Sequence, residues 1–421
     1  MKKKLMILFG ILAILFLQAC MENFDEGSGQ ASTQAFSEPY LTEDSGGDFE
    51  KYQGVRMIKE QQYNPWAVTK NGCYEISKEA PYNIYYTDIS EGQRDILPVQ
   101  LDLSYISENG TNWDILAGEA PNVFAIEDSL YMVTDGNNYV PGFLYRLDPV
   151  KGKHEKLAEF EGCHYFENSV ASDGEAFYMI YRNLSGDGLL IKVLIKEKRV
   201  EELHKFSHTQ SVIKSAFDDC LIIESSDSPS AKDCPDYNER LEQTEYVLYR
   251  YSLQNGKIEK LSQWQYHHKS IGYKAQNAYA FDSAADCLKV IDLENDKEKL
   301  LIGAFSECGI EIGDIAEITD IRENKIIIQC QKGQYVLDID KLIIKRLRPL
   351  NGVIYPEIIG AYGDKYLIPT NWNSSVEALR IFTGKDKDII KLALIDKDDF
   401  WKQRYRFQEI EDVFLEADKS R

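Results

Sequence analysis

The chain has 421 residues, enough for two or three domains by length alone, and carries 69 acidic and 48 basic side chains, a net charge of −21. Such a balance argues against binding nucleic acid or anionic lipid through bulk charge, because both need a basic surface. Hydrophobic residues make up 43% of the chain and aromatic residues 12%, which is ample for a large core.

Residues 1–19 have the features of a bacterial export signal. A basic segment, Lys2–Lys4, precedes an apolar segment, Leu5–Leu17, that is too short for a comfortable transmembrane helix. Leu17-Gln18-Ala19-Cys20 then resembles the lipobox of bacterial lipoproteins, although Gln18 is a less usual residue there. The resemblance implies cleavage before Cys20, diacylation of that cysteine and anchoring on the extracytoplasmic face of the cell membrane. An uncleaved anchor or an ordinary secretory signal is the alternative.

Residues 20–54 are expected to form a lipidated, disordered tether. Positions 21–50 are rich in Gly, Ser, Thr and Glu and contain eight acidic residues and no basic one. Loss of the signal removes three lysines, which leaves 45 basic and 69 acidic residues and a net charge of −24. Membrane association must therefore come from the lipid and not from electrostatic attraction.

A unit of four short strands recurs between residues 55 and 395. The unit is clearest at 122–160, where β-branched and aromatic runs are separated by turns rich in Gly, Pro, Asn and Asp. Its first half, a strand, a short polar turn and an apolar strand, starts again at Trp66, Phe124, Ser169, Ser215, Gly272, Ile318 and Gly360. Copies spaced by about 40 to 60 residues are typical of propeller blades.

The repeat predicts an all-β fold, a β-propeller of seven blades with four antiparallel strands each. Six or eight blades are the alternatives, because the spacing stretches at Leu101–Glu119 and at Asp227–Thr244. Val55–Ile58 is expected to be a strand that closes the propeller against the last blade. Residues 396–421 are expected to form a short C-terminal helix or tail, either packed on the rim or used as an interaction helix.

Two motifs resemble known propeller families. Tyr85-Tyr86-Thr87-Asp88 resembles the YWTD signature, with Tyr in place of Trp. An aromatic residue before an Asp in the third strand, followed by a Gly or Asp turn and Lys, is similar to bacterial TolB-like lipoprotein propellers over about residues 65–395. This resemblance concerns the fold and implies no catalytic residue. The aspartates at 88, 148, 292 and 338 are expected to cap turns.

The order of strands also predicts where a site lies. In a four-strand meander the loops between strands two and three share one face with the connections between blades, and here they are long and varied, including Asp227–Thr244. The ligand-binding candidates assigned to this face are Trp113, Tyr139, His164, His267, His268, Asn371, Trp372 and Asn373. An indole between two amides suits a sugar ring or a peptide backbone, unless it folds inward over its own blade.

No catalytic, metal or cofactor motif is recognisable. HExxH, G-x-S-x-G, Walker loops and CxxC pairs are missing, and the spacing of His204 and His208 suits a metal only on a helix. Seven cysteines follow Cys20, an odd number that cannot all pair internally. We therefore expect no cofactor and a binding module for a protein, peptide or glycan. The alternatives are a hydrolase or lyase acting on an exported substrate at the channel mouth, or a structural subunit of an envelope complex.

Overall fold

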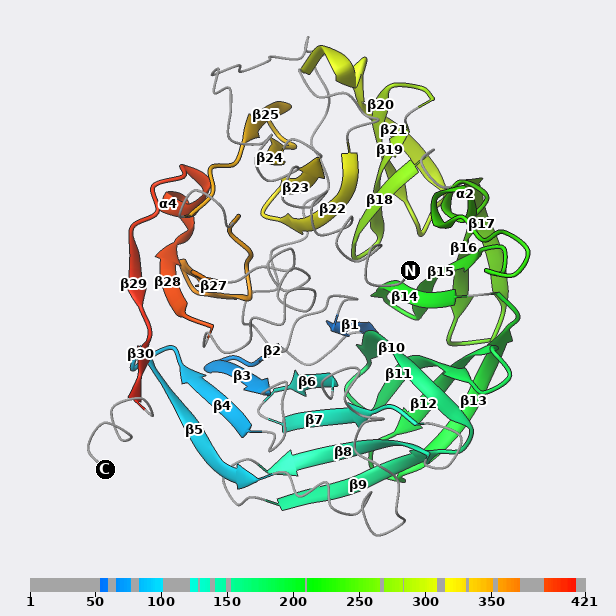
Figure 1. The fold of residues 1–421 in the computed structure, drawn as a ribbon, viewed down its shortest axis with the longest axis horizontal. Helices are drawn as coiled ribbons and strands as arrows, with labels where there is room; N and C mark the ends of the chain where they lie inside the picture. The colour runs from blue at the N-terminus through cyan, green and yellow to red at the C-terminus, as the bar shows by residue number, and fades with distance from the viewer. Residues whose placement is uncertain are drawn as a thin grey trace, which may run out of the picture. The chain divides into compact units, whose positions relative to one another are not determined.

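The structure is a computed structural model that describes residues 54–59, 66–76, 83–100, 122–127, 129–136, 141–148, 153–208, 210–265, 269–282, 284–308, 315–330, 333–350, 355–371 and 390–413. The fold is an all-β propeller of seven blades with very little helix, as predicted (Figure 1). Blades one to four and seven form one compact unit, and blades five and six form another.

Each blade is an antiparallel meander in which strands follow one another in chain order. Blades one and two consist of β2 (Trp66–Val68), β3 (Gly72–Ile76), β4 (Asn83–Asp88), β5 (Gln93–Gln100), β6 (Asn122–Ile126), β7 (Ser129–Thr134), β8 (Gly142–Asp148) and β9 (Lys153–Phe160). Blades three and four consist of β10 (Cys163–Ser172), β11 (Ala176–Asn183), β12 (Gly188–Leu194), β13 (Arg199–Phe206), β14 (Gln210–Phe217), β15 (Cys220–Asp227), β16 (Glu245–Ser252) and β17 (Ile258–Gln265). Blades five to seven consist of β18 (Lys269–Lys274), β19 (Asn277–Asp282), β20 (Cys287–Asp292), β21 (Lys297–Gly303), β22 (Ile315–Arg322), β23 (Lys325–Cys330), β24 (Gly333–Asp338), β25 (Ile343–Arg346), β26 (Gly360–Tyr362), β27 (Lys365–Pro369), β28 (Leu392–Asp396) and β29 (Phe407–Glu409).

Short turns fix the register of the repeats. The turns between first and second strands place Glu127, Asp218 and Ala275 at positive φ, and Glu323-Asn324 has two such residues in succession. Two residues at positive φ form the tight turn whose twist matches paired strands.

All seven predicted first halves coincide with the first two strands of a blade. Three of the four predicted Asp caps are present, since Asp88, Asp292 and Asp338 accept backbone N–H groups from the turns that follow them, and the turn after Asp148 lies outside the described residues.

The hydrophobic core lies between neighbouring blades. One cluster joins blades two and three around Phe124, Tyr131 and Phe177, whose rings contact edge to face or stacked. Similar clusters join blades one and two, three and four, and five and six. Outermost strands such as β9 and β13 carry Lys or Arg and Glu among their apolar residues. Charged side chains on an edge strand oppose pairing with another chain.

The N-terminal strand differs from its predicted place. β1 (Arg56–Lys59) pairs with β10 of blade three, and not with the last blade. Figure 1 shows it on the side of β10 away from β11. The physical reason is two-sided packing, because Met57 packs on the cluster between blades three and four while Ile58 packs on the cluster between blades two and three. The strand closes no seam of the propeller.

The C-terminal segment contains two strands in addition to the short helix that was predicted. The expected helix is present as α4 (Lys397–Trp401), whose Phe400 is buried against Tyr366. The chain then returns to the sheet as β29, the fourth strand of blade seven, and as β30 (Glu411–Asp412), which pairs in parallel with β5 of blade one. Blade seven therefore extends beyond residue 395. The third strand of that blade is β28, and residues 372–389 before it lie outside the described residues.

The stretched spacing at Asp227–Thr244 hides no strand pair. The segment leaves β15, forms α2 (Tyr237–Glu242) and returns to β16, which pairs with β15 along its full length. Asp236 caps α2 by accepting the backbone N–H of Glu239 at 3.0 Å. The other stretched region, Leu101–Glu119, lies outside the described residues.

Candidate functional site

The predicted loop face is formed by blades two, three and four. In blade three, Cys163 lies opposite Asn183 and Gly188 opposite Phe206, so the ends of all four strands meet at one edge. The backbone N–H of Leu184 reaches Gly162 at 3.0 Å along this edge. Blade two joins it, because Asp135 accepts the backbone N–H of Phe166 at 2.8 Å. The second-to-third loops and the blade connections of these blades therefore share one face.

The insertion of blade four is the largest described feature of this face. Its ends are tied together, since the hydroxyls of Ser228 and Thr244 lie 2.8 Å apart and Thr244 also donates to the Arg240 carbonyl. Ser230 closes a turn with Asp233 at 2.5 Å. These short-range bonds give the insertion a defined shape, so its outward side chains are presented by an ordered support.

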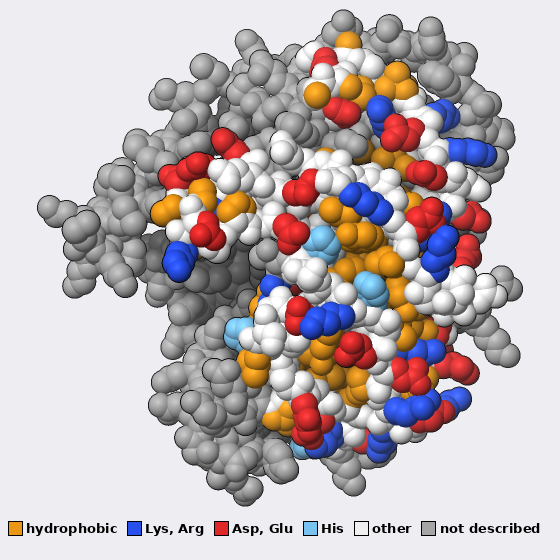
Figure 2. All heavy atoms as spheres, turned by 90° about the vertical axis from the view of Figure 1, so that its right-hand side faces the viewer, with side chains coloured by type: hydrophobic (Ala, Val, Ile, Leu, Met, Phe, Trp, Pro, Cys, Tyr) orange, Lys and Arg blue, Asp and Glu red, His pale blue; other side chains and the backbone are white. Residues whose placement is uncertain are grey.

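Among the described residues, two large apolar side chains are exposed on the loop face. Tyr237, in α2, is 64% exposed, and Leu184, in the loop between β11 and β12, is 48% exposed. The guanidinium of Arg240 lies 5.7 Å from the ring centre of Tyr237 and supports it by a cation–π contact. Figure 2 views the molecule from the side on which α2 lies and shows acidic and basic side chains interspersed, with hydrophobic side chains between them. Tyr and Arg are frequent anchors of protein interfaces.

The insertion is acidic. Between positions 227 and 245 the sequence has six acidic and two basic residues. Some of these carboxylates are engaged by neighbours: Asp227 lies 2.7 Å from His208, while Asp233 and Asp236 accept the hydrogen bonds described above. A ligand of this face would therefore meet a negative surface around an exposed aromatic ring.

His208, on this face, contacts both an acidic side chain and a tyrosine hydroxyl. Its Nδ1 lies 2.7 Å from the Asp227 carboxylate and its Nε2 lies 2.9 Å from the Tyr249 hydroxyl. Burial, followed by the charges of Asp227 and Glu245, raises the pKa of Tyr249. Because both ring nitrogens are engaged, His208 ties the blade connection to β15 and β16. His204 lies in β13, and the centre of its ring is 4.6 Å from that of Phe206, two residues further along the strand. Burial lowers the pKa of His204.

Two of the predicted ligand-binding residues can be placed. His164 is exposed at the start of β10, on the loop face, with its ring 5.5 Å from that of Tyr165. Asn371 is half-buried, and its side-chain oxygen accepts the backbone N–H of Lys391 at 2.7 Å, which closes the connection between β27 and β28. The other predictions lie outside the described residues: Cys20, Trp113, Tyr139, His267, His268, Trp372 and Asn373.

Sequence reasoning missed Leu184 and Tyr237 as individual residues. The long insertion containing Tyr237 was assigned to the right face, but nothing in the sequence distinguishes an exposed tyrosine from a buried one. Leu184 lies in a loop with Asn, Ser, Gly and Asp. A single apolar residue among such turn-forming residues was the only indication in the sequence that its side chain is exposed.

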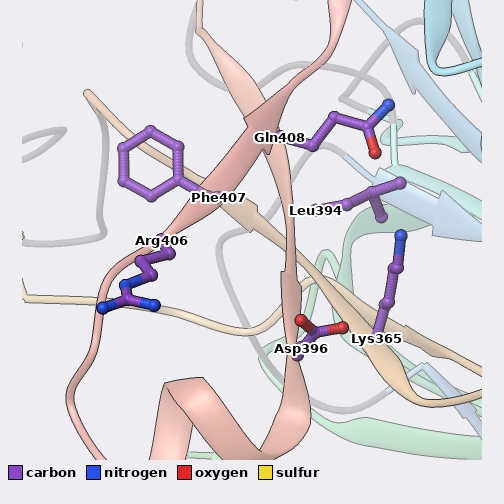
Figure 3. Close-up of a pocket in the computed structure, with 6 residues that line it drawn as sticks. All are labelled: Lys365, Leu394, Asp396, Arg406, Phe407 and Gln408. Carbon is purple, nitrogen blue, oxygen red and sulfur yellow. The ribbon is translucent and has the colours of Figure 1, made fainter.

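A shallow depression on blade seven has the wrong geometry for a convergent site. It is lined by Lys365, Leu394, Asp396, Arg406, Phe407 and Gln408. Figure 3 shows Arg406 and Phe407 on one side of β29, with Gln408 and Leu394 on the other. The charged groups of the depression therefore do not point to one centre.

Within the described ranges, no group of three or more His, Cys, Asp or Glu side chains is arranged to hold a metal ion. No helix in the same ranges is long and apolar enough to cross a membrane.

Comparison with known proteins gives the fold. No known protein family and no curated protein sequence matches the chain. Among solved structures it is similar to prolyl endopeptidases studied for inter-domain dynamics, with TM-score 0.50 and 11% identity over 85% of this chain and 50% of that one. Puromycin hydrolase matches with TM-score 0.48 and 9% identity over 83% of this chain and 53% of that one.

The β-propeller domain of the trilobed protease from Pyrococcus furiosus matches with TM-score 0.46 and 11% identity, over 84% of this chain and 98% of that one. The chain thus spans about half the length of puromycin hydrolase and of the prolyl endopeptidases, and nearly all of this isolated propeller domain. At such identities the similarity shows the fold alone. The molecule is a seven-bladed β-propeller, similar in fold to the prolyl endopeptidases over about half of their length.

Proposed function

We propose that this chain is a lipid-anchored, extracytoplasmic binding module without catalytic activity, which engages a protein, peptide or glycan through the loop face of blades two to four. The observation that carries the proposal is the exposed Tyr237, held over an ordered acidic insertion on the face where the long loops gather. An aromatic ring exposed on a rigid support costs little entropy to bind. The lipobox-like Leu17–Cys20 supports the membrane anchor.

The two faces of blade four differ in a way that favours recognition on one of them. The turn between β16 and β17 is closed by its own residues, since Asn255 accepts the backbone N–H of Lys257 at 2.9 Å. The opposite face of the same blade carries the insertion with α2. Function is found more often on long loops held by a rigid scaffold than on such tight turns.

Binding arrays provide the test. The purified chain is applied to immobilised panels of peptides and bacterial surface glycans, beside Tyr237→Ala and the control Gln254→Ala, an exposed residue on the opposite face of the same blade. We expect a subset of ligands to retain the wild-type chain and the control, and to lose Tyr237→Ala at least tenfold. Equal retention of all three chains would place the binding surface elsewhere.

A further inference from the structure

β1 has no counterpart in the repeat. It adds a fifth strand to blade three, in the order β1-β10-β11-β12-β13, at the free edge of the blade's first strand. In the described part of the chain, blade one also has a fifth strand, β30, but at the opposite edge, next to β5. Among the described strands, the edge of β10 is therefore the one place where a segment outside the blade pattern pairs with a first strand.

The slot that holds β1 has a wall on each side. Besides β10, the strand contacts β14 of blade four and β6 of blade two. Val55 is buried and joins the cluster between blades three and four, as does Met57, while Ile58 packs on the cluster between blades two and three. A segment must be extended to fit, because its side chains enter sockets on opposite sides alternately.

The attachment of β1 is short and carries an energetic cost. Three residue pairs hold it, Arg56 with Ser172, Met57 with Ala171 and Lys59 with Val170, with an irregularity before the last. Lys59 is 7% exposed and donates to the carbonyl of Val123 at 2.7 Å. Burial lowers the pKa of Lys59 to about 7, against an opposing effect of Cys73. Removing an ammonium group from water in this way opposes docking of the strand.

The edge of β10 needs a backbone partner wherever it is shielded from water. An edge strand presents a row of N–H and C=O groups, and a buried group of this kind without a hydrogen-bond partner destabilises the fold. Extended peptides that add a strand to such an edge are a common mode of recognition. The segment found there, Val55-Arg56-Met57-Ile58-Lys59, contains two basic residues in a chain of net charge −21, so long-range attraction favours the approach of a basic segment, even though burial of the lysine then carries a cost.

We propose that the edge of β10 is a strand-accepting site, in which β1 is a replaceable occupant that gives way to an extended, basic and apolar peptide segment of a partner protein. The pattern that fits is the one β1 displays: an apolar residue, a basic one, two apolar ones and a lysine. The site is separate from the loop face, and either can exist without the other.

Peptide binding in trans tests this with the full chain. A fluorescent peptide of residues 51–60, KYQGVRMIKE, is titrated against the wild-type chain and against Met57→Asp, which places a charge in the apolar socket. A second variant, Gly54→Val, disturbs β1 from outside the slot, because a Cβ at Gly54 would lie 2.5 Å from the Asp218 carbonyl. Matched controls are the peptide with its own Met57→Asp change and a scrambled peptide.

We expect the peptide to bind both variants at least tenfold more tightly than the wild-type chain, since the intact β1 competes, and both control peptides to bind at least tenfold more weakly. Absence of binding to folded variants would overturn the proposal. A failure of both variants to fold would overturn it too, because β1 would then be an indispensable strand.

Hydrogen exchange on the wild-type chain tests independently whether β1 leaves its site by local opening. Amides of β1 should exchange at least tenfold faster than those of β11, through local release of the strand. Equal rates would mean that β1 leaves only on global unfolding, which contradicts replacement. If size-exclusion chromatography shows a dimer that the peptide dissociates, the occupant is a second copy of this chain and the partner proposal is wrong.

Discussion

The guanidinium of Arg94 lies 3.7 Å from the carboxylate of Asp412, and so joins β5 of the first blade to the last described strand, β30. The same guanidinium contacts Glu75 at 2.6 Å and lies 4.7 Å from the ring centre of Tyr85. The Arg94 side chain is 1% exposed. The C-terminal strand is therefore held on the first blade by a buried charge as well as by backbone pairing.

Arg94→Met should destabilise the protein by about 3 to 5 kcal/mol, because it leaves two carboxylates in a poorly hydrated place without their cation. Urea unfolding measures the change. The matched control is Arg146→Met, which removes an ion pair with Glu155 in which the arginine side chain is 48% exposed; it should cost less than about 1 kcal/mol. Equal losses in the two variants would show that Arg94 is no more important than a surface charge.

Lys59→Met should change how stability depends on pH. Burial lowers the pKa of Lys59 from 10.5 to about 7, so between these values the unfolded chain binds more protons than the folded one. The free energy of unfolding therefore rises with pH from about 7 to 10.5. Below pH 7 the full cost of burying the charged Lys59 side chain is present.

Relative to wild type, Lys59→Met should be more stable at pH 6, with the difference shrinking by up to about 1.4 kcal/mol per pH unit above pH 7. Urea unfolding of both chains at pH 6, 8 and 9 measures this. Lys257→Met, at an exposed position, serves as the control and should show a constant difference. A constant difference for Lys59→Met as well would mean that the amine is hydrated in the folded protein.

The thiols should be inert in the folded protein. All seven cysteines after Cys20 are free, and all but Cys220 are buried. Burial, and then a hydrogen bond to Asp219, raises the pKa of Cys220 to about 11, so little thiolate is present at neutral pH. At pH 8, Ellman's reagent should modify at most one of the seven thiols in the folded chain, and all seven in urea. Rapid modification of several thiols without urea would contradict the burial.

Cys20→Ala should release the protein from membranes or leave it unprocessed. The resemblance to a lipobox places two acyl chains on this cysteine, and the acidic mature chain gains no attraction from anionic lipid. Membrane fractionation with immunoblotting measures the distribution, and Gln18→Ala is the control that leaves the cysteine in place. If Cys20→Ala remained processed and membrane-bound to the same extent, the lipid anchor would be wrong.

Most of the fold could be predicted because each blade repeats a local signal. The pattern of a strand, a two- or three-residue turn and an apolar strand can be recognised within about ten residues, as at Phe124 and Ser215. The number of copies then predicts the number of blades. The places of β1 and β30 could not be predicted, since each pairs with a strand distant in sequence and carries no turn that fixes its partner.

The candidate site was predictable only to the level of a face. The alternation of strands decides which loops share a face, and the placed residues His164 and His208 follow it. Exposure depends on tertiary packing. Asn371 accepts a backbone N–H in the connection between β27 and β28, whereas Tyr237 is exposed and lies outside the core.

Site-specific photocrosslinking in bacterial cells that express the chain tests the binding function most directly. A benzophenone amino acid replaces Tyr237 in one chain and Gln254, on the opposite face of blade four, in another. The account predicts a discrete crosslinked product from position 237 that is lost when Leu184→Asp is added, and none from position 254. Equal products from both positions, or a product from 254 alone, would contradict recognition by the loop face.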